Sequence, residues 1–188
     1  MPYGLESIDQ RQQARALKGR IKRLIQKELE EGMDPWWFIS FHYNDGKMNE
    51  DQVVRDMGDL KNKLKREIYR RRVRRIKGEG SFPYPKMLAM NEVSHLGTGQ
   101  FHSHLITEAF PEKLYSQRMM ELLFKRILPS KVKALSRWKS VDVQRIHPDP
   151  KDLKRLASYL GKQVDQDYVA LDGFNSDFSK EERRDVNN

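Results

Sequence analysis

Two strand-like runs joined by a glycine-containing turn constrain the fold of this chain more than any other feature. Residues 84–95 and 100–107 are mostly apolar runs with polar positions interspersed, and the sequence LGTG lies between them at 96–99. Glycine adopts the positive φ angles that tight hairpin turns need, so this segment predicts two adjacent antiparallel strands. The chain is therefore expected to contain an antiparallel sheet.

The rest of the chain alternates between strand and helix patterns. Two further strands are expected at 36–43 and 140–147 because aromatic, β-branched or alternating residues are bounded there by turn residues or a helix start. Apolar residues at helical spacing predict helices at 8–31, 49–77, 111–128 and 148–163. With the first helix set aside, the order is βαββαβ. This order predicts an α+β fold with a ferredoxin-like or RRM-like antiparallel sheet, helices on one face, an open second face and an added N-terminal helix.

The expected domain organisation follows from these elements. Residues 1–33 form an N-terminal amphipathic helix, residues 34–171 form the main domain, and residues 172–188 form a flexible polar tail. No run approaches the roughly 18 to 20 apolar residues of a spanning helix, and no export signal is recognised at the N-terminus. We therefore expect no membrane association and a cytoplasmic location.

Charge and cysteine content narrow the function. The formal net charge is +9 and the sequence pI is about 9.7, which favours a polyanionic partner such as DNA or RNA. The predicted helix at 49–77 has a strongly basic second half that could follow nucleic-acid phosphates, although a merely solvated helix face is the alternative. Its candidate contacts are Lys65, Arg66, Arg70, Arg71 and Arg74. The chain has no cysteine, so a metal ion would need nitrogen and oxygen ligands.

His102 and His104 form a candidate metal site. Side chains alternate along a strand, so these two point to the same face with their Cα atoms about 6 to 7 Å apart. If the hairpin turn centres on 97–98, Glu92 lies opposite or near His104 and Ser94 near His102. Two imidazoles and a carboxylate suit Mn²⁺ or Mg²⁺. The alternative is that both histidines are ordinary surface residues of a strand.

Tyr159 and Lys162 are a second candidate pair. They lie three residues apart in the predicted helix at 148–163, so they share one helix face. A tyrosine needs a nearby cation or metal to act as a nucleophile at neutral pH, and Lys162 could supply that charge. The alternative is that Tyr159 covers the edge of the core.

Taken together, these motifs resemble the HUH endonucleases, most closely the single-tyrosine Rep proteins that initiate rolling-circle replication of plasmids and small viruses. FISFHYN at 38–44 stands in the place of the first family motif, and EVSHLGTGQFHSHLI at 92–106 resembles the second with its upstream acid. LASYLGKQ at 156–163 resembles the third. The resemblance covers roughly residues 36–170.

The resemblance implies a metal-dependent enzyme that nicks and joins single-stranded DNA at a replication origin. Mn²⁺ or Mg²⁺, held by His102, His104 and a polar residue, would polarise the scissile phosphate. Tyr159 would attack that phosphate to give a 5′-phosphotyrosine and a free 3′-hydroxyl, and Lys162 would balance charge there. The chain has no phosphate-binding loop of a helicase, so a host helicase and polymerase are expected partners.

Several alternatives stay open. Glu92 is the expected third ligand, but in some transposase relatives a glutamine on the tyrosine helix takes this role, as Gln163 could here. His95 is a further competitor, although its parity points it to the other face. His42 could face the site and touch DNA, or be a solvated strand residue. The alternative functions are a single-strand transposase of the same superfamily and a non-catalytic nucleic-acid-binding module.

Overall fold

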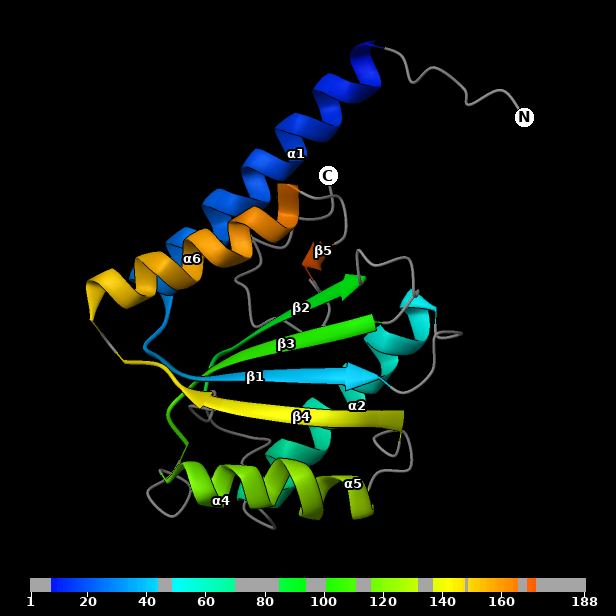
Figure 1. The fold of residues 1–188 in the computed structure, drawn as a ribbon, viewed down its shortest axis with the longest axis vertical. Coiled ribbons are helices and arrows are strands. Elements are labelled where there is room, and N and C mark those ends of the chain that lie inside the picture. The colour runs from blue at the N-terminus through cyan, green and yellow to red at the C-terminus, as the bar shows by residue number, and fades with distance from the viewer. Residues whose placement is uncertain are drawn as a thin grey trace, which may run out of the picture.

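The protein folds around a five-stranded sheet in which every neighbouring pair of strands is antiparallel (Figure 1). This computed structural model describes residues 8–43, 49–69, 85–93, 101–110, 116–131, 137–147, 149–165 and 169–171. The strand order is β4-β1-β3-β2-β5. The strands are β1 (Pro35–Tyr43), β2 (Met87–Val93), β3 (Phe101–Glu108), β4 (Trp138–Arg145) and β5 (Val169–Leu171). The α+β class and the first four strands are as predicted, whereas the short β5, which pairs with β2, was not.

The helices also follow the predicted order. Helix α1 (Ile8–Lys27) continues into a π-helical turn, η1 (Glu28–Gly32), and α2 (Glu50–Tyr69) follows β1. The third helical segment consists of α4 (Gln117–Leu122), η3 (Leu123–Ile127) and α5 (Leu128–Lys131), and begins where Ser116 accepts a hydrogen bond from the Met119 backbone. The last helix is α6 (Pro150–Asp165). The predicted helical residues 70–77 and 111–115 lie outside the described residues. No described helix is long and apolar enough to cross a membrane.

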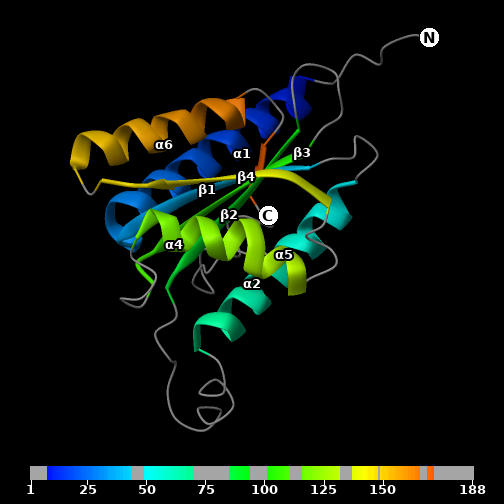
Figure 2. The same ribbon diagram turned by 60° about the horizontal axis from the view of Figure 1, so that its bottom comes forward.

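Helices cover both faces of the sheet, so the predicted open face is wrong. Figure 2 shows α2, α4 and α5 on one side and α1 and α6 on the other. The first side encloses the larger core, which includes Ile39 and Phe41 of β1 and Leu105 of β3. On the second side, Leu88 and Ile106 project from β2 and β3 and pack with buried residues of α1 and α6. Apolar side chains on both faces of these strands require cover on both faces, because burying apolar surface is the main stabilising force.

The register of the β2-β3 hairpin differs from the predicted one by two residues. Glu92 pairs with His102, and Met90 pairs with His104. Because a shift of two residues keeps every side chain on its face, the prediction that Glu92, His102 and His104 share one face is confirmed. The predicted partner Ser94 lies outside the described residues.

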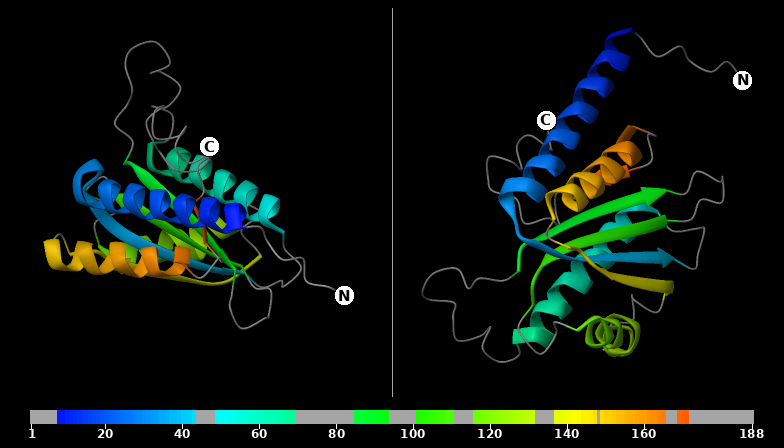
Figure 3. Two further views of the ribbon diagram at one scale, coloured as in Figure 1. Left: turned by 90° about the horizontal axis from the view of Figure 1, so that it is seen from above. Right: turned by 60° about the vertical axis from the view of Figure 1, so that its left-hand side comes forward.

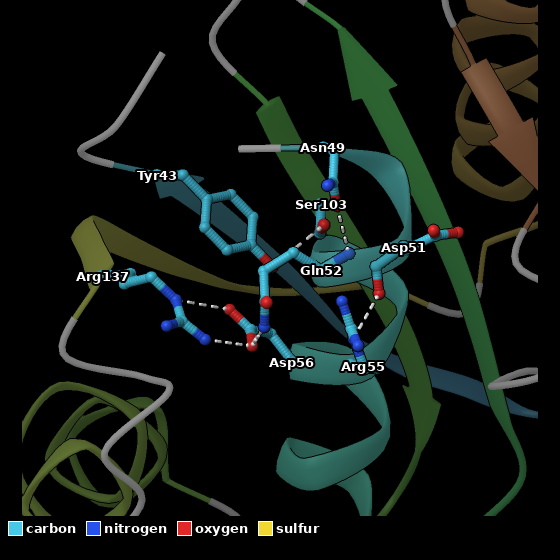
Figure 4. A network of polar contacts seen from close by, with 8 residues as sticks. All are labelled: Tyr43, Asn49, Asp51, Gln52, Arg55, Asp56, Ser103 and Arg137. Carbon is cyan, nitrogen blue, oxygen red and sulfur yellow. Dashed lines mark hydrogen bonds and ion pairs between the residues drawn. The ribbon is translucent and has the colours of Figure 1, made fainter. Parts of the chain in front are cut away.

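A buried polar network ties α2 to the sheet within the larger core (Figure 4). The Asp56 carboxylate is only 1% exposed and accepts two hydrogen bonds from the Arg137 guanidinium, of 3.0 and 2.6 Å. Gln52 donates a further one of 2.9 Å to Asp56. Nearby, Ser103 contacts the Tyr43 hydroxyl, and burial raises the pKa of this phenol. Paired in this way, the buried carboxylate carries its charge without the full cost of desolvation.

Candidate metal and nucleophile site

His104 is the centre of the candidate site and is held at both ring nitrogens. It lies in the middle of β3 and is 5% exposed. Its Nε2 is 3.2 Å from Glu92 Oε2 on β2, and its Nδ1 is 2.9 Å from Ser40 Oγ on β1. An ionised carboxylate only accepts hydrogen bonds, so Nε2 carries the proton when it contacts Glu92. The Ser40 hydroxyl can either donate to Nδ1 or accept from it.

His102 and His42 form an edge-to-face pair beside this group. Their ring centroids are 4.4 Å apart, and the two residues are register partners on β3 and β1. The pKa of each imidazole is lowered, chiefly by burial and next by the charge that a neighbouring histidine would carry. Both rings are therefore held in the neutral form, which is the form that binds metal ions.

The donor set fits a divalent ion in part as the side chains lie. Neighbouring ligand atoms around an octahedral ion with bonds of about 2.1 Å are about 3 Å apart, close to the 3.2 Å between Glu92 Oε2 and His104 Nε2. His102 is the direct register partner of Glu92. Among the described residues, however, no three histidine or carboxylate side chains are grouped closely enough to hold an ion as they stand. The His102 ring packs against His42, so it would have to rotate to complete the set.

Tyr159 reaches the same site from α6. Its side chain is 49% exposed and meets the Phe38 ring edge-on, with centroids 6.5 Å apart. Phe38 in turn stacks on His104 at 5.2 Å, with 13° between the ring planes. The next residue, Leu160, is fully buried and fixes this turn of the helix on the sheet. The Phe38 ring thus connects His104 with Tyr159, which lies 55 residues later in the sequence.

Of the other predicted residues, some lie near the site, some lie on the other face of the sheet and some lie outside the described residues. Lys162 and Gln163 lie in the turn of α6 after Tyr159, as predicted, but their side chains are outside the described part of the structure. Lys65 and Arg66 belong to α2, which packs on the opposite face of the sheet from His104 and Tyr159 (Figure 2). Arg70, Arg71 and Arg74 lie outside the described residues.

Three contacts at the site were not assigned from the sequence. Ser40 and Phe38 share a face of β1 with His42, but their contacts with His104 depend on the pairing of β1 with β3, two strands that are distant in the sequence. Asp142 of β4 is the register partner of Ser40 and acts electrostatically on His42. The alternating pattern of β4 indicates which of its residues share a face with Asp142. It does not indicate which strand lies beside β4.

Comparison of the chain with protein-family models, with curated proteins and with solved structures finds no match. The geometry of the site and the resemblance of its motifs are therefore what indicate a function for this chain.

Proposed function

We propose that this protein is a metal-dependent enzyme of the HUH endonuclease type that nicks and joins single-stranded DNA through a tyrosine. One observation carries the proposal: Tyr159 and His104 lie on the same side of the sheet and contact the same ring, Phe38. His104 stacks on this ring, and Tyr159 meets it edge-on. A nucleophile and a metal-ligand pair within reach of one substrate group are what such a reaction needs.

The chain's own residues account for the chemistry as follows. The Tyr159 Oη attacks the phosphorus of the scissile phosphodiester, forming the O–P bond as the bond to the 3′-oxygen breaks. The phenolic proton is lost to solvent and the departing 3′-oxygen gains one, which leaves a 3′-hydroxyl and a 5′-phosphotyrosine. The linkage keeps the energy of the phosphodiester, so attack by a 3′-hydroxyl reverses the reaction and rejoins the strand. Lys162, one helical turn from Tyr159, balances the charge of the phenolate and the phosphate.

Glu92, His102 and His104 are the proposed ligands of Mn²⁺ or Mg²⁺. When bound, the ion supplies Lewis-acid polarisation of the scissile phosphate. The 3.2 Å contact between Glu92 and His104 supports Glu92 over Gln163 as the oxygen ligand. Ser40 holds the other ring nitrogen of His104, as the outer partner of a metal-bound histidine usually does.

The biological role proposed for this activity is initiation of rolling-circle replication of a plasmid or virus. The free 3′-hydroxyl primes synthesis, while a helicase and a polymerase of the host complete it. His42 is a proposed DNA contact at the end of the site, and Lys65, Arg66, Arg70, Arg71 and Arg74 remain proposed contacts elsewhere on the chain.

A ferredoxin-like core is part of the same proposal. The order β1, α2, β2, β3, α4–α5, β4 supports it, because each strand pair joined through a helix is separated by one further strand. β3 lies between β1 and β2, and β1 lies between β3 and β4.

Covalent capture tests the proposed function without knowledge of the origin sequence. The protein is incubated with Mn²⁺ and a library of single-stranded oligonucleotides with a randomised core, and adducts that resist denaturation are isolated and sequenced. We expect the wild type to form an adduct from a defined sequence. The fragment 5′ of the cut should be released with a free 3′-hydroxyl, which a polymerase can extend once the fragment is annealed to a template. Tyr159→Phe, which keeps the ring contact with Phe38, should form none.

Tyr69→Phe is the matched control because it makes the same chemical change at the end of α2, the helix on the opposite face of the sheet. It should form the adduct as the wild type does, and a chelator should abolish the adduct in both. An adduct that persists in Tyr159→Phe, or no adduct from the whole library with either Mn²⁺ or Mg²⁺, would overturn the proposal.

A further inference from the structure

Helix α1 carries a concentration of positive charge that the active-site proposal does not use. Its twenty residues contain seven basic side chains and a single acidic one, Asp9. Arg20, Arg23 and Lys27 are exposed and follow one another at helical spacing, so they form a stripe, and the exposed Arg15 lies beside its N-terminal end. The fully buried Ile25 occupies the opposite side of the helix.

This charge lies on the same side of the sheet as the proposed nucleophile. α1 packs along α6, the helix that bears Tyr159, and the backbone of Gly161 approaches the aliphatic stem of Lys22 so closely that a Cβ there would be 3.5 Å from it. The predicted basic helix, α2, is on the other side. Of the basic helices described, α1 and α6 are the two that share a side with the site.

α1 is firmly attached at one end and projects at the other. Leu29 is fully buried, and Glu28, 2% exposed, forms a 2.5 Å ion pair with Lys86 at the edge of β2. Figure 3 shows that the N-terminal half of the helix runs past α6 and away from the strands. The basic stripe is therefore held on the same side of the sheet as Tyr159, on a helix that extends outward past α6.

We propose that the exposed face of α1 binds the phosphate backbone of double-stranded DNA that flanks the nicked strand, an inference that rests on the proposed function. Proteins that hold single strands use aromatic side chains on which bases stack, and α1 contains no aromatic residue. Duplex DNA has twice the linear charge of one strand and can be bound through its phosphates without base stacking. A row of exposed arginines on a helix without aromatic residues matches the duplex better than the single strand.

Salt-dependent binding tests this inference. A fluorescent duplex and a single strand of the same length are titrated with the full-length protein, without metal, at several salt concentrations. The variant Arg15→Gln/Arg20→Gln/Arg23→Gln should bind the duplex at least about tenfold more weakly at low salt, and its salt slope should fall by about 2.7, since each lost phosphate contact removes about 0.9. The single strand should lose less.

The matched control removes three cations from the opposite side of the sheet, in Arg118→Gln/Lys125→Gln/Arg126→Gln, all of which are exposed. Its duplex slope should change by less than about 1. Equal losses in the two triple variants, an unchanged slope in the α1 variant, or an equal loss for single and double strands would each overturn the inference. Thermal melts of the variants verify that they fold. Covalent capture separates the two proposals: no adduct from the wild type, together with a loss of slope specific to α1, refutes the nicking reaction and leaves the duplex contact standing.

Discussion

The hydroxyl of Ser40 is the most informative single group to remove. It makes one 2.9 Å hydrogen bond to the buried Nδ1 of His104. When Nε2 uses its lone pair to bind a metal ion, Nδ1 carries the proton and donates it to the Ser40 Oγ. When no ion is bound, Nε2 donates to Glu92 and the same hydroxyl donates to Nδ1. Ser40 thus satisfies His104 in both states, which a carbonyl oxygen would not do.

Ser40→Ala leaves a buried ring nitrogen without this partner. Loss of a neutral hydrogen bond costs about 0.5–1.5 kcal/mol, and an unsatisfied buried group costs about 1–3 kcal/mol. The contact also raises the basicity of a metal-bound histidine, so its loss costs the bound state more than the free state. A difference of about 1.4 kcal/mol between the two states corresponds to a tenfold loss of affinity, at the lower end of the 10- to 100-fold that outer partners of metal ligands usually contribute. We expect Mn²⁺ to bind about tenfold more weakly to Ser40→Ala by calorimetric titration.

Two further variants give this measurement its meaning. Ser40→Thr keeps the hydroxyl on a strand position that tolerates β-branching, and should bind Mn²⁺ close to the wild-type affinity. Ser140→Ala makes the same substitution at an exposed position of β4 on the same side of the sheet, opposite His42, and should have no effect. Wild-type affinity in Ser40→Ala would refute the reasoning. Equal losses in Ser40→Ala and Ser40→Thr would assign the effect to packing instead of the hydroxyl.

Three further predictions concern stability. Arg137→Met leaves the buried Asp56 carboxylate without its ion pair and should lower the free energy of unfolding in urea by about 3 kcal/mol, and adding Asp56→Leu should recover much of this. Burial raises the pKa of Tyr43, so the folded protein keeps this proton to higher pH than the unfolded chain does. Its contribution is full below about pH 10 and is lost as the pH rises through the folded-state pKa, so the free energy of unfolding of the wild type should fall relative to Tyr43→Phe above pH 10. Mn²⁺ at about 100 times its Kd should stabilise the wild type by about 2.7 kcal/mol in a thermal melt, reversibly with a chelator, and Glu92→Gln should lose most of this gain.

The candidate ligands could be placed on one face from the sequence because a register error of two residues leaves every side chain on its face. The predicted register of the hairpin was wrong by two residues, yet Glu92, His102 and His104 kept their common face. The contacts of His104 with Ser40 and Phe38 could not be predicted in the same way. They depend on which strand lies beside β3, and strand order is decided by the packing of the whole domain.

The second layer of helices left a signal that the prediction did not use. Met87, Leu88, Ala89 and Met90 form an uninterrupted apolar run, and all four are buried. A strand that is buried on both faces has such a run, whereas a strand with one solvated face alternates. The pattern of β2 thus already contradicted an open second face, and the amphipathic residues 8–31 were available to cover it. Only β5, a three-residue strand, left no pattern long enough to be recognised.

The face of the sheet under α1 and α6 is divided into an apolar and a polar half, and the division has a functional consequence. Leu88 and Ile106 pack beneath the two helices, while Glu92 and His102 lie farther along the same strands. A nucleophile must be held within about 0.5 Å of its working position, which a helix on a packed core achieves better than a loop. The apolar half supplies this support to α6, and α1 completes it by packing against that helix. The N-terminal helix is therefore a structural part of the proposed active site, since Leu24 and Ile25 of α1 share a buried cluster with Leu160, the residue after Tyr159.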